Sequence, residues 1–60
     1  SGFHHLGFEV EDIEQEIANL EKKGGRIVCK PVIGFENRLI SFIYFDSVPG
    51  KLIELVTKPE

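Results

Sequence analysis

One segment, residues 12–25, carries the periodicity of a helix, and it limits the folds open to the chain. Apolar side chains recur there at i, i+4 and i+7, as Ile13, Ile17 and Leu20. This spacing predicts one helix with a single narrow apolar stripe. Because one stripe can cover only one face of a sheet, any sheet formed by the other residues keeps a face that this helix does not reach.

The ends of the predicted helix are marked by capping residues. Asp12 is a favourable N-cap, and Gln15 three positions later completes the pattern of a capping box. Gly24 and Gly25 follow two lysines, and we expect one of them to adopt the left-handed conformation at C′. The helix is therefore predicted to begin directly after Asp12 and to end before Gly25.

The remaining segments favour β-strands. Runs rich in β-branched and aromatic residues cover four ranges: 3–10, 26–30, 38–45 and 51–57. Pro31 makes the second strand an edge strand or ends its ladder, with residues 32–35 continuing it after a bend. Glu36 and Asn37 predict a tight turn. The third run is apolar on both faces apart from Ser41, which predicts a central strand covered on both sides.

The element order β-α-β-β-β predicts an α+β fold, a single βαβββ module. A helical crossover makes the first two strands parallel, and two hairpins then make the last strand parallel to the first. We expect the sheet order 1-4-3-2, with the helix on one face. The helix is expected to cover four residues of the sheet: Leu6, Phe8, Ile53 and Leu55. The other face is expected to carry five: Phe3, His5, Leu52, Glu54 and Val56. Nothing in the chain remains to cover this second face, so it is predicted to pack against a partner.

The length of 60 residues supports the same expectation. A unit this small buries only about 60% of its unfolded surface, so a lone core is marginal. Cys29 is the one cysteine, which excludes an internal disulfide. Residues 1–60 are interpreted as one half-module without a linker or second domain. Since the sequence contains no methionine, even at position 1, we expect either a processed chain or a piece of a longer protein.

Charge and hydropathy exclude several classes of partner. The formal net charge is −3, with no basic patch, so we expect neither nucleic acid nor an anionic membrane as a partner. No apolar run approaches the roughly 20 residues of a membrane span, and no signal-peptide pattern opens the chain. We therefore expect a cytoplasmic protein.

His5 and Glu54 are the candidate metal ligands. Each lies in mid-strand on the face opposite the helix, and a buried carboxylate between Leu52-Ile53 and Leu55-Val56 requires a counter-charge. Imidazole and carboxylate together suit divalent zinc, nickel, cobalt, iron or manganese. The alternative is that Glu54 extends to solvent at a sheet edge and His5 is a hydrogen-bonded surface histidine.

Three further residues are candidate functional groups. His4 is expected to point toward the helix as a structural histidine. Cys29 has no base or second thiol beside it in the sequence and is interpreted as a small apolar residue. Glu9 shares the predicted face of His5 but lies near the strand end, where a solvated role is favoured.

Two sequence motifs resemble a known family. Residues 2–13 (GFHHLGFEVEDI) look like the start of the second module of methylmalonyl-CoA epimerases, and residues 50–55 (GKLIEL) look like its last strand. Both are typical of the vicinal oxygen chelate superfamily, which includes glyoxalase I, extradiol dioxygenases and bleomycin- and fosfomycin-resistance proteins. In that family the second histidine of the pair and the glutamate of the last strand bind the metal, which here implies His5 and Glu54.

The resemblance also implies a second module. Family members place two βαβββ modules face to face around the metal, and each supplies two ligands. The partner of this chain would be either an N-terminal half of a longer protein or a second copy of the chain, giving a set of two His5 and two Glu54. The implied reaction is proton abstraction next to a carbonyl by a metal-dependent isomerase or lyase, epimerase-like or lactoylglutathione lyase-like, with Glu54 as base. The alternative is a non-catalytic module that binds a small molecule or dimerises.

Overall fold

The helix α1 (Ile13–Lys22) begins and ends where the sequence predicts. The Asp12 carboxylate accepts a hydrogen bond of 3.1 Å from the backbone amide of Gln15. At the other end Gly24 has φ +100°, and the amide of Gly25 donates to the carbonyl of Leu20 at 2.9 Å, as in a Schellman motif. The Gln15 side chain donates to Asn19, so only the Asp12 half of the predicted capping box forms.

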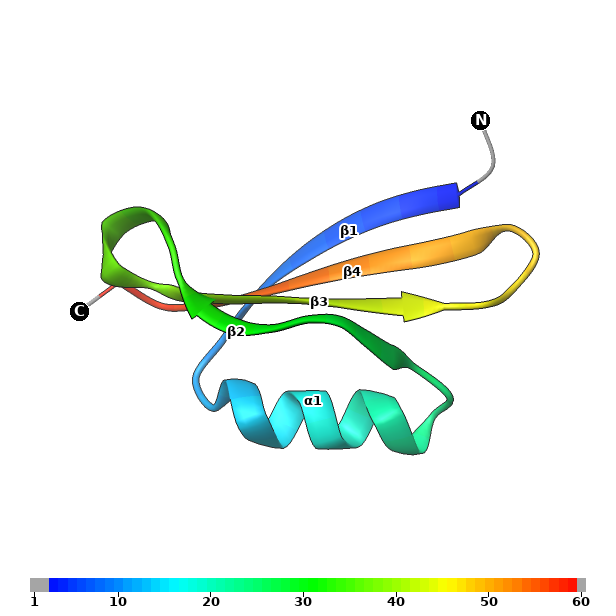
Figure 1. Ribbon diagram of the computed structural model, residues 1–60, viewed down its shortest axis with the longest axis horizontal. Coiled ribbons are helices and arrows are strands. Elements are labelled where there is room, and N and C mark those ends of the chain that lie inside the picture. The colour runs from blue at the N-terminus through cyan, green and yellow to red at the C-terminus, as the bar shows by residue number, and fades with distance from the viewer. Residues whose placement is uncertain (1–2, 60) are drawn as a thin grey trace.

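The computed structural model describes residues 3–59 and confirms the predicted βαβββ module (Figure 1). The strands are β1 (Phe3–Val10), β2 (Arg26–Ile33), β3 (Leu39–Phe45) and β4 (Gly50–Thr57), and a short 3-10 turn η1 (Phe35–Asn37) joins β2 to β3. The sheet order is β1-β4-β3-β2. β1 pairs with β4 in parallel, and the other two pairs are antiparallel. The chain is therefore an α+β unit with one helix on one face of the sheet.

The turn and the edge strand also follow the sequence. Glu36 and Asn37 both have positive φ, 57° and 62°, in the tight turn that the sequence predicts. β2 is an edge strand, as Pro31 indicates, but it runs to Ile33 as one strand of eight residues. Two register shifts, on either side of Cys29, take up the bend that was expected after Lys30.

The core lies between α1 and the sheet. Its buried apolar side chains come from β1, α1, β3 and β4: Val10, Ile13, Ile17, Ile43, Ile53 and Leu55. Ser41 is also fully buried on this face and donates a hydrogen bond of 2.6 Å to the carbonyl of Cys29. β3 is central, as predicted, but the chain itself covers only one of its faces. Its other face, formed by Ile40, Phe42 and Tyr44, is half-buried.

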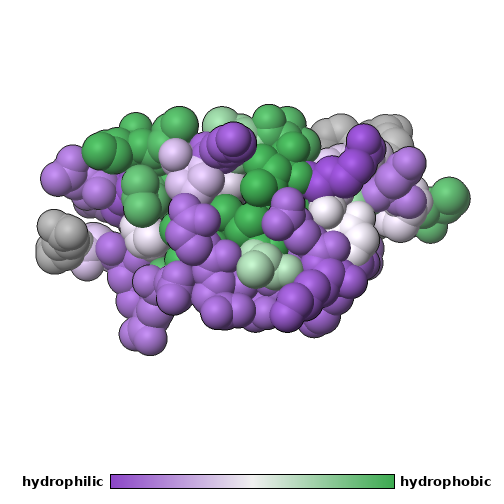
Figure 2. All heavy atoms as spheres, turned by 60° about the horizontal axis from the view of Figure 1, so that its bottom comes forward, coloured by the Kyte–Doolittle hydropathy of each residue, from purple (hydrophilic) through white to green (hydrophobic). Residues whose placement is uncertain are grey.

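The predicted cover of the sheet by the helix is confirmed at Ile53 and Leu55, which are buried, and is wrong at Leu6 and Phe8. These side chains are 43% and 49% exposed, because α1 packs mainly on β2, β3 and β4. Figure 2 shows hydrophilic residues over the outer surface of the helix and hydrophobic side chains still visible beyond it, over the sheet. Both faces of β1 are thus less covered than those of the inner strands.

The face opposite the helix carries the predicted site residues. Leu52, Glu54 and Val56 are half-buried on β4, and His5 is exposed on β1. No other element of residues 3–59 packs over this face, which is called the open face below. The predicted directions of the Phe3 and His4 side chains lie outside the described part of the chain.

Candidate metal-binding site

Parallel pairing of the first and last strands brings His5 and Glu54 together. His5 lies opposite Leu52, and Gly7 lies opposite Glu54, so the two candidate ligands are diagonal neighbours on the open face. The distance from His5 Nε2 to Glu54 Oε1 is 3.6 Å. The fold thus joins two residues that are 49 positions apart in the chain.

The surroundings of the pair are apolar on one side and open on the other. The Phe42 ring lies 6.4 Å from the His5 ring, centroid to centroid, and Phe42 is paired directly with Glu54 across β3 and β4. The His5 side chain is 54% exposed and that of Glu54 is 32% exposed. Gly7 has no side chain to cover the carboxylate, and a Cβ at this position would still lie 4.0 Å from Glu54 Oε1. A ligand can therefore approach the carboxylate over β1.

The donor atoms are compatible with a shared divalent ion. Ligand bonds of 2.0–2.2 Å at tetrahedral angles separate two donors by about 3.4 Å, and the observed 3.6 Å is within a few tenths of an ångström of that value. Imidazole nitrogen and carboxylate oxygen are common donors for zinc and similar ions. Among the side chains that the structure describes, those of residues 5–59, no third His, Cys, Asp or Glu joins the pair. The described chain therefore supplies two ligands of a set.

Glu9 takes part in a different contact. Its carboxylate lies 2.6 Å from Arg38 Nη2, and Arg38 Nε donates to the carbonyl of Thr57 at 2.7 Å. Arg38 also lies 3.5 Å from Glu36. Glu9 is thus part of an ion-pair network that ties β1 and β4 to the start of β3. The sequence prediction did not include Arg38, because only the register of the folded sheet shows that it lies close to Glu9 and Thr57.

Cys29 is half-buried, with its sulfur 3.4 Å from the carbonyl oxygen of Lys30. Among the described residues Cys29 forms no disulfide. This environment agrees with its interpretation as a small apolar residue.

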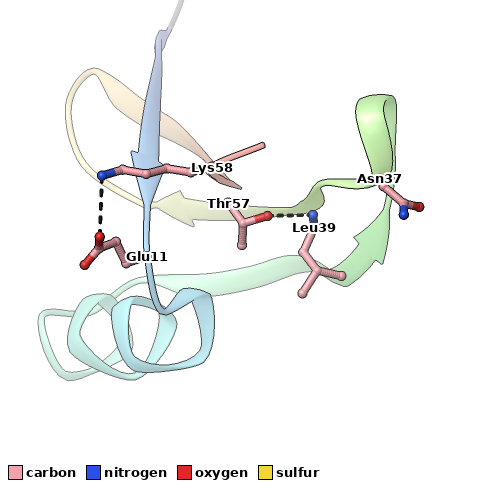
Figure 3. A pocket seen from close by; sticks show the side chains of 5 residues that line it. All are labelled: Glu11, Asn37, Leu39, Thr57 and Lys58. Carbon is pink, nitrogen blue, oxygen red and sulfur yellow. Dashed lines mark hydrogen bonds and ion pairs between the residues drawn. The ribbon is translucent and has the colours of Figure 1, made fainter. Parts of the chain in front are cut away.

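A hollow of about 420 Å³ lies at the other end of β1 and β4 from His5 (Figure 3). It is lined by Glu11, Asn37, Leu39, Thr57 and Lys58. Three of its polar side chains are already engaged: Lys58 Nζ lies 3.5 Å from Glu11, and the Thr57 hydroxyl accepts a 2.9 Å hydrogen bond from the amide of Leu39. A metal-binding or catalytic site is therefore better supported at His5 and Glu54 than in this hollow.

Arg26 and Tyr44 form a contact that the sequence prediction missed. The guanidinium carbon of Arg26 lies 5.9 Å from the centre of the Tyr44 ring, and the two residues are paired across β2 and β3. Side-chain alternation counted forward from Ser41 would have placed Tyr44 on the open face. It would not have identified the residue opposite it, because the bulges in β2 shift the register.

In the described part of the chain, α1 with its ten residues is the one α-helix, and no helix is long and apolar enough to span a membrane.

Comparisons with known proteins bear on the family of the chain. Searches of curated proteins and of solved structures found no match. A family model described as Glyoxalase/Bleomycin resistance protein/Dioxygenase superfamily matches residues 1–42. This range includes His5 and ends before Glu54. Since the match covers more than half of the chain and the fold is a βαβββ module, the chain belongs to the glyoxalase/bleomycin resistance protein/dioxygenase superfamily.

Proposed function

We propose that the chain is half of a divalent-metal site, with His5 and Glu54 as ligands, in an enzyme that removes a proton next to a carbonyl. The observation that carries this proposal is the 3.6 Å approach of His5 Nε2 to Glu54 Oε1 on the open face. Members of the superfamily commonly use divalent metals, and the donor pair suits zinc, nickel, cobalt, iron or manganese.

The second half of the site would come from another βαβββ module. Two donors leave a divalent ion with an incomplete protein ligand set. The open face also exposes part of Phe42, Leu52 and Val56, which a facing module would cover. Either a second copy of the chain or the other half of a longer protein satisfies this requirement. A second copy would give two histidines and two glutamates, whose carboxylates neutralise the dication.

When bound, the ion would supply Lewis-acid polarisation of substrate oxygens. The residues of the chain would then have separate tasks. Glu54 would accept the proton as general base if its carboxylate loosened from the ion during turnover, and this carboxylate is partly open to the side of Gly7. His5 would hold its ring against Phe42 and remain a ligand. Phe42 and Leu52 would exclude water from the carboxylate once the face is covered.

The nearest reaction types are those of methylmalonyl-CoA epimerase and glyoxalase I. The motifs at residues 2–13 and 50–55 support this choice, because they resemble the first and last strands of such enzymes. Both reactions begin with removal of a proton next to a carbonyl, which is the task proposed for Glu54.

A second candidate function is a non-catalytic module that binds a small molecule or dimerises. It is favoured by the exposure of His5, 54% of its side chain, and by the lack of a third donor among the described side chains of residues 5–59. This candidate needs neither the histidine nor the carboxylate for binding, which separates it from the enzyme.

The test is metal content measured together with solution mass, on protein purified without chelators and then supplied with Zn²⁺ or Mn²⁺. One ion shared by two chains, in a particle with the mass of a dimer, supports the symmetric site and directs epimerase and glyoxalase assays to it. Failure to bind either ion above a His5→Ala/Glu54→Ala control would contradict the metal site. One ion per monomer would contradict the shared ligand set.

A further inference from the structure

One cross-strand row of the sheet leads from His5 to a cation at the opposite edge. His5 is paired with Leu52, Leu52 with Tyr44, and Tyr44 with Arg26. Residues paired directly across strands share a face, so all four lie on the open face. Three steps between neighbouring strands place Arg26 about 14 Å from His5 along this row.

The Tyr44 ring in this row is held against the sheet. A Cβ at Gly50 would collide with the Tyr44 hydroxyl and lie 2.9 Å from Cζ. Gly50 is buried, so the ring lies over the bare backbone of β4. The Cζ atom of the Arg26 guanidinium lies over the ring, 5.9 Å from the ring centre. This distance is within the range of a cation–π contact.

Arg26 differs from the other arginine in its charge partners. Arg38 is 16% exposed and contacts the carboxylates of Glu9 and Glu36. Arg26 is exposed, and no carboxylate of residues 3–59 lies within 4.0 Å of it. A guanidinium held on an aromatic ring keeps its planar donors available for a carboxylate or a phosphate.

We propose that Arg26, held on Tyr44, binds an anionic group of the substrate at the far end of the row that begins at His5. The inference rests on the proposed function, because it takes the open face as the substrate face. It assigns a substrate class: an elongated molecule whose carboxylate or phosphate lies at the β2 edge when its reacting oxygens lie at His5, three strand steps away. The side chains of Leu52 and Tyr44 between the two ends suit an apolar or planar middle portion.

The test is an NMR titration of the ¹⁵N-labelled chain with inorganic phosphate and, separately, with acetate, following the amide signals of β2 and β3. We expect saturable shifts around Arg26, and the tighter of the two anions identifies the group. Arg26→Gln should weaken binding about tenfold, as expected for lost charge-assisted hydrogen bonds. Lys30→Gln is the matched control, because it removes one exposed positive charge from the same strand; it should change binding less than about twofold.

The aromatic platform is tested with two substitutions of Tyr44. Tyr44→Phe keeps the ring and should bind like the original chain, whereas Tyr44→Leu should weaken binding about threefold. The absence of saturable binding in the original chain, or equal losses in Arg26→Gln and Lys30→Gln, would overturn the assignment. Zn²⁺ titration of the same variants separates the two proposals. Arg26→Gln should keep the metal, and His5→Ala/Glu54→Ala should lose the metal while keeping the anion.

Discussion

His5 Nε2 lies 3.6 Å from Glu54 Oε1 because β1 and β4 pair in parallel with Gly7 opposite Glu54. Each residue alone is ordinary in a strand. Their contact depends on the crossover through α1, which leads to β2 at the far edge of the sheet, and on the two hairpins that then bring β4 back beside β1. Glu54 is shielded on one side by Phe42, its partner on β3, and remains open on the side of Gly7.

Replacing both residues, His5→Ala with Glu54→Ala, should abolish stabilisation by divalent ions. A ligand that binds only the folded state raises its stability by about 2.7 kcal/mol at a concentration of 100 times Kd, and this gain should vanish. Without metal the variant should unfold within about 1 kcal/mol of the original chain, because both side chains are partly solvated. Thermal unfolding with and without Zn²⁺ measures both effects. His4→Ala is the matched control for loss of a neighbouring histidine, and an equal loss in that variant would contradict the assignment.

Gly7→Val should separate stability from ligand access. Valine has a higher strand propensity than glycine, so the free energy of unfolding should stay the same or rise by about 0.5–1 kcal/mol. Its two methyl groups would fill the space beside the Glu54 carboxylate, where a Cβ alone already lies 4.0 Å from Oε1. Metal or substrate affinity should therefore fall about tenfold or more. Chemical denaturation combined with Zn²⁺ titration measures the two quantities, and unchanged affinity would show that ligands do not approach over β1.

Local chemistry explains which parts of the fold could be predicted from the sequence. Asp12 and Gly24 define the ends of α1 through interactions within a few residues, and the alternation around Glu54 defines its face. The sheet order followed from the crossover and two hairpins. These features depend on neighbouring residues or on general chain topology, so one sequence was enough to predict them.

The wrong or missing predictions concern packing between distant elements. The exposure of Leu6 and Phe8 depends on where α1 lies across the sheet, and an apolar stripe on a helix does not encode that position. Likewise, the bulges of β2 decide which residue faces Tyr44. The proximity of His5 and Glu54 was predictable because the resemblance to a family identified both residues, whereas Arg26 lies in no recognised motif.

Gly50→Ala should destabilise the chain through Tyr44. The new Cβ would lie 2.9 Å from Tyr44 Cζ, and such overpacking costs about 1–3 kcal/mol. Adding Tyr44→Leu should recover most of this loss, so the two changes should show a favourable coupling in a double-mutant cycle. Urea unfolding of the four chains measures the coupling. Gly7→Ala is the control, because its Cβ meets nothing closer than 4.0 Å; additive effects at positions 44 and 50 would contradict the proposed ring placement.

Ser41→Ala should weaken the junction of β2 and β3. Ser41 is fully buried, and its hydroxyl donates a 2.6 Å hydrogen bond to the carbonyl of Cys29, at the bulge where the β2 register shifts. Removing the donor from a buried carbonyl costs about 1–3 kcal/mol, and each kcal/mol lowers Tm by about 4–8 °C in a domain of this size. Ser47→Ala is the matched control, because Ser47 donates a 2.6 Å bond to the Pro49 carbonyl at an exposed site; we expect its Tm to fall far less. Equal losses in the two variants would mean that burial does not strengthen the Ser41 bond, and the bulge would then be held by the β-ladder alone.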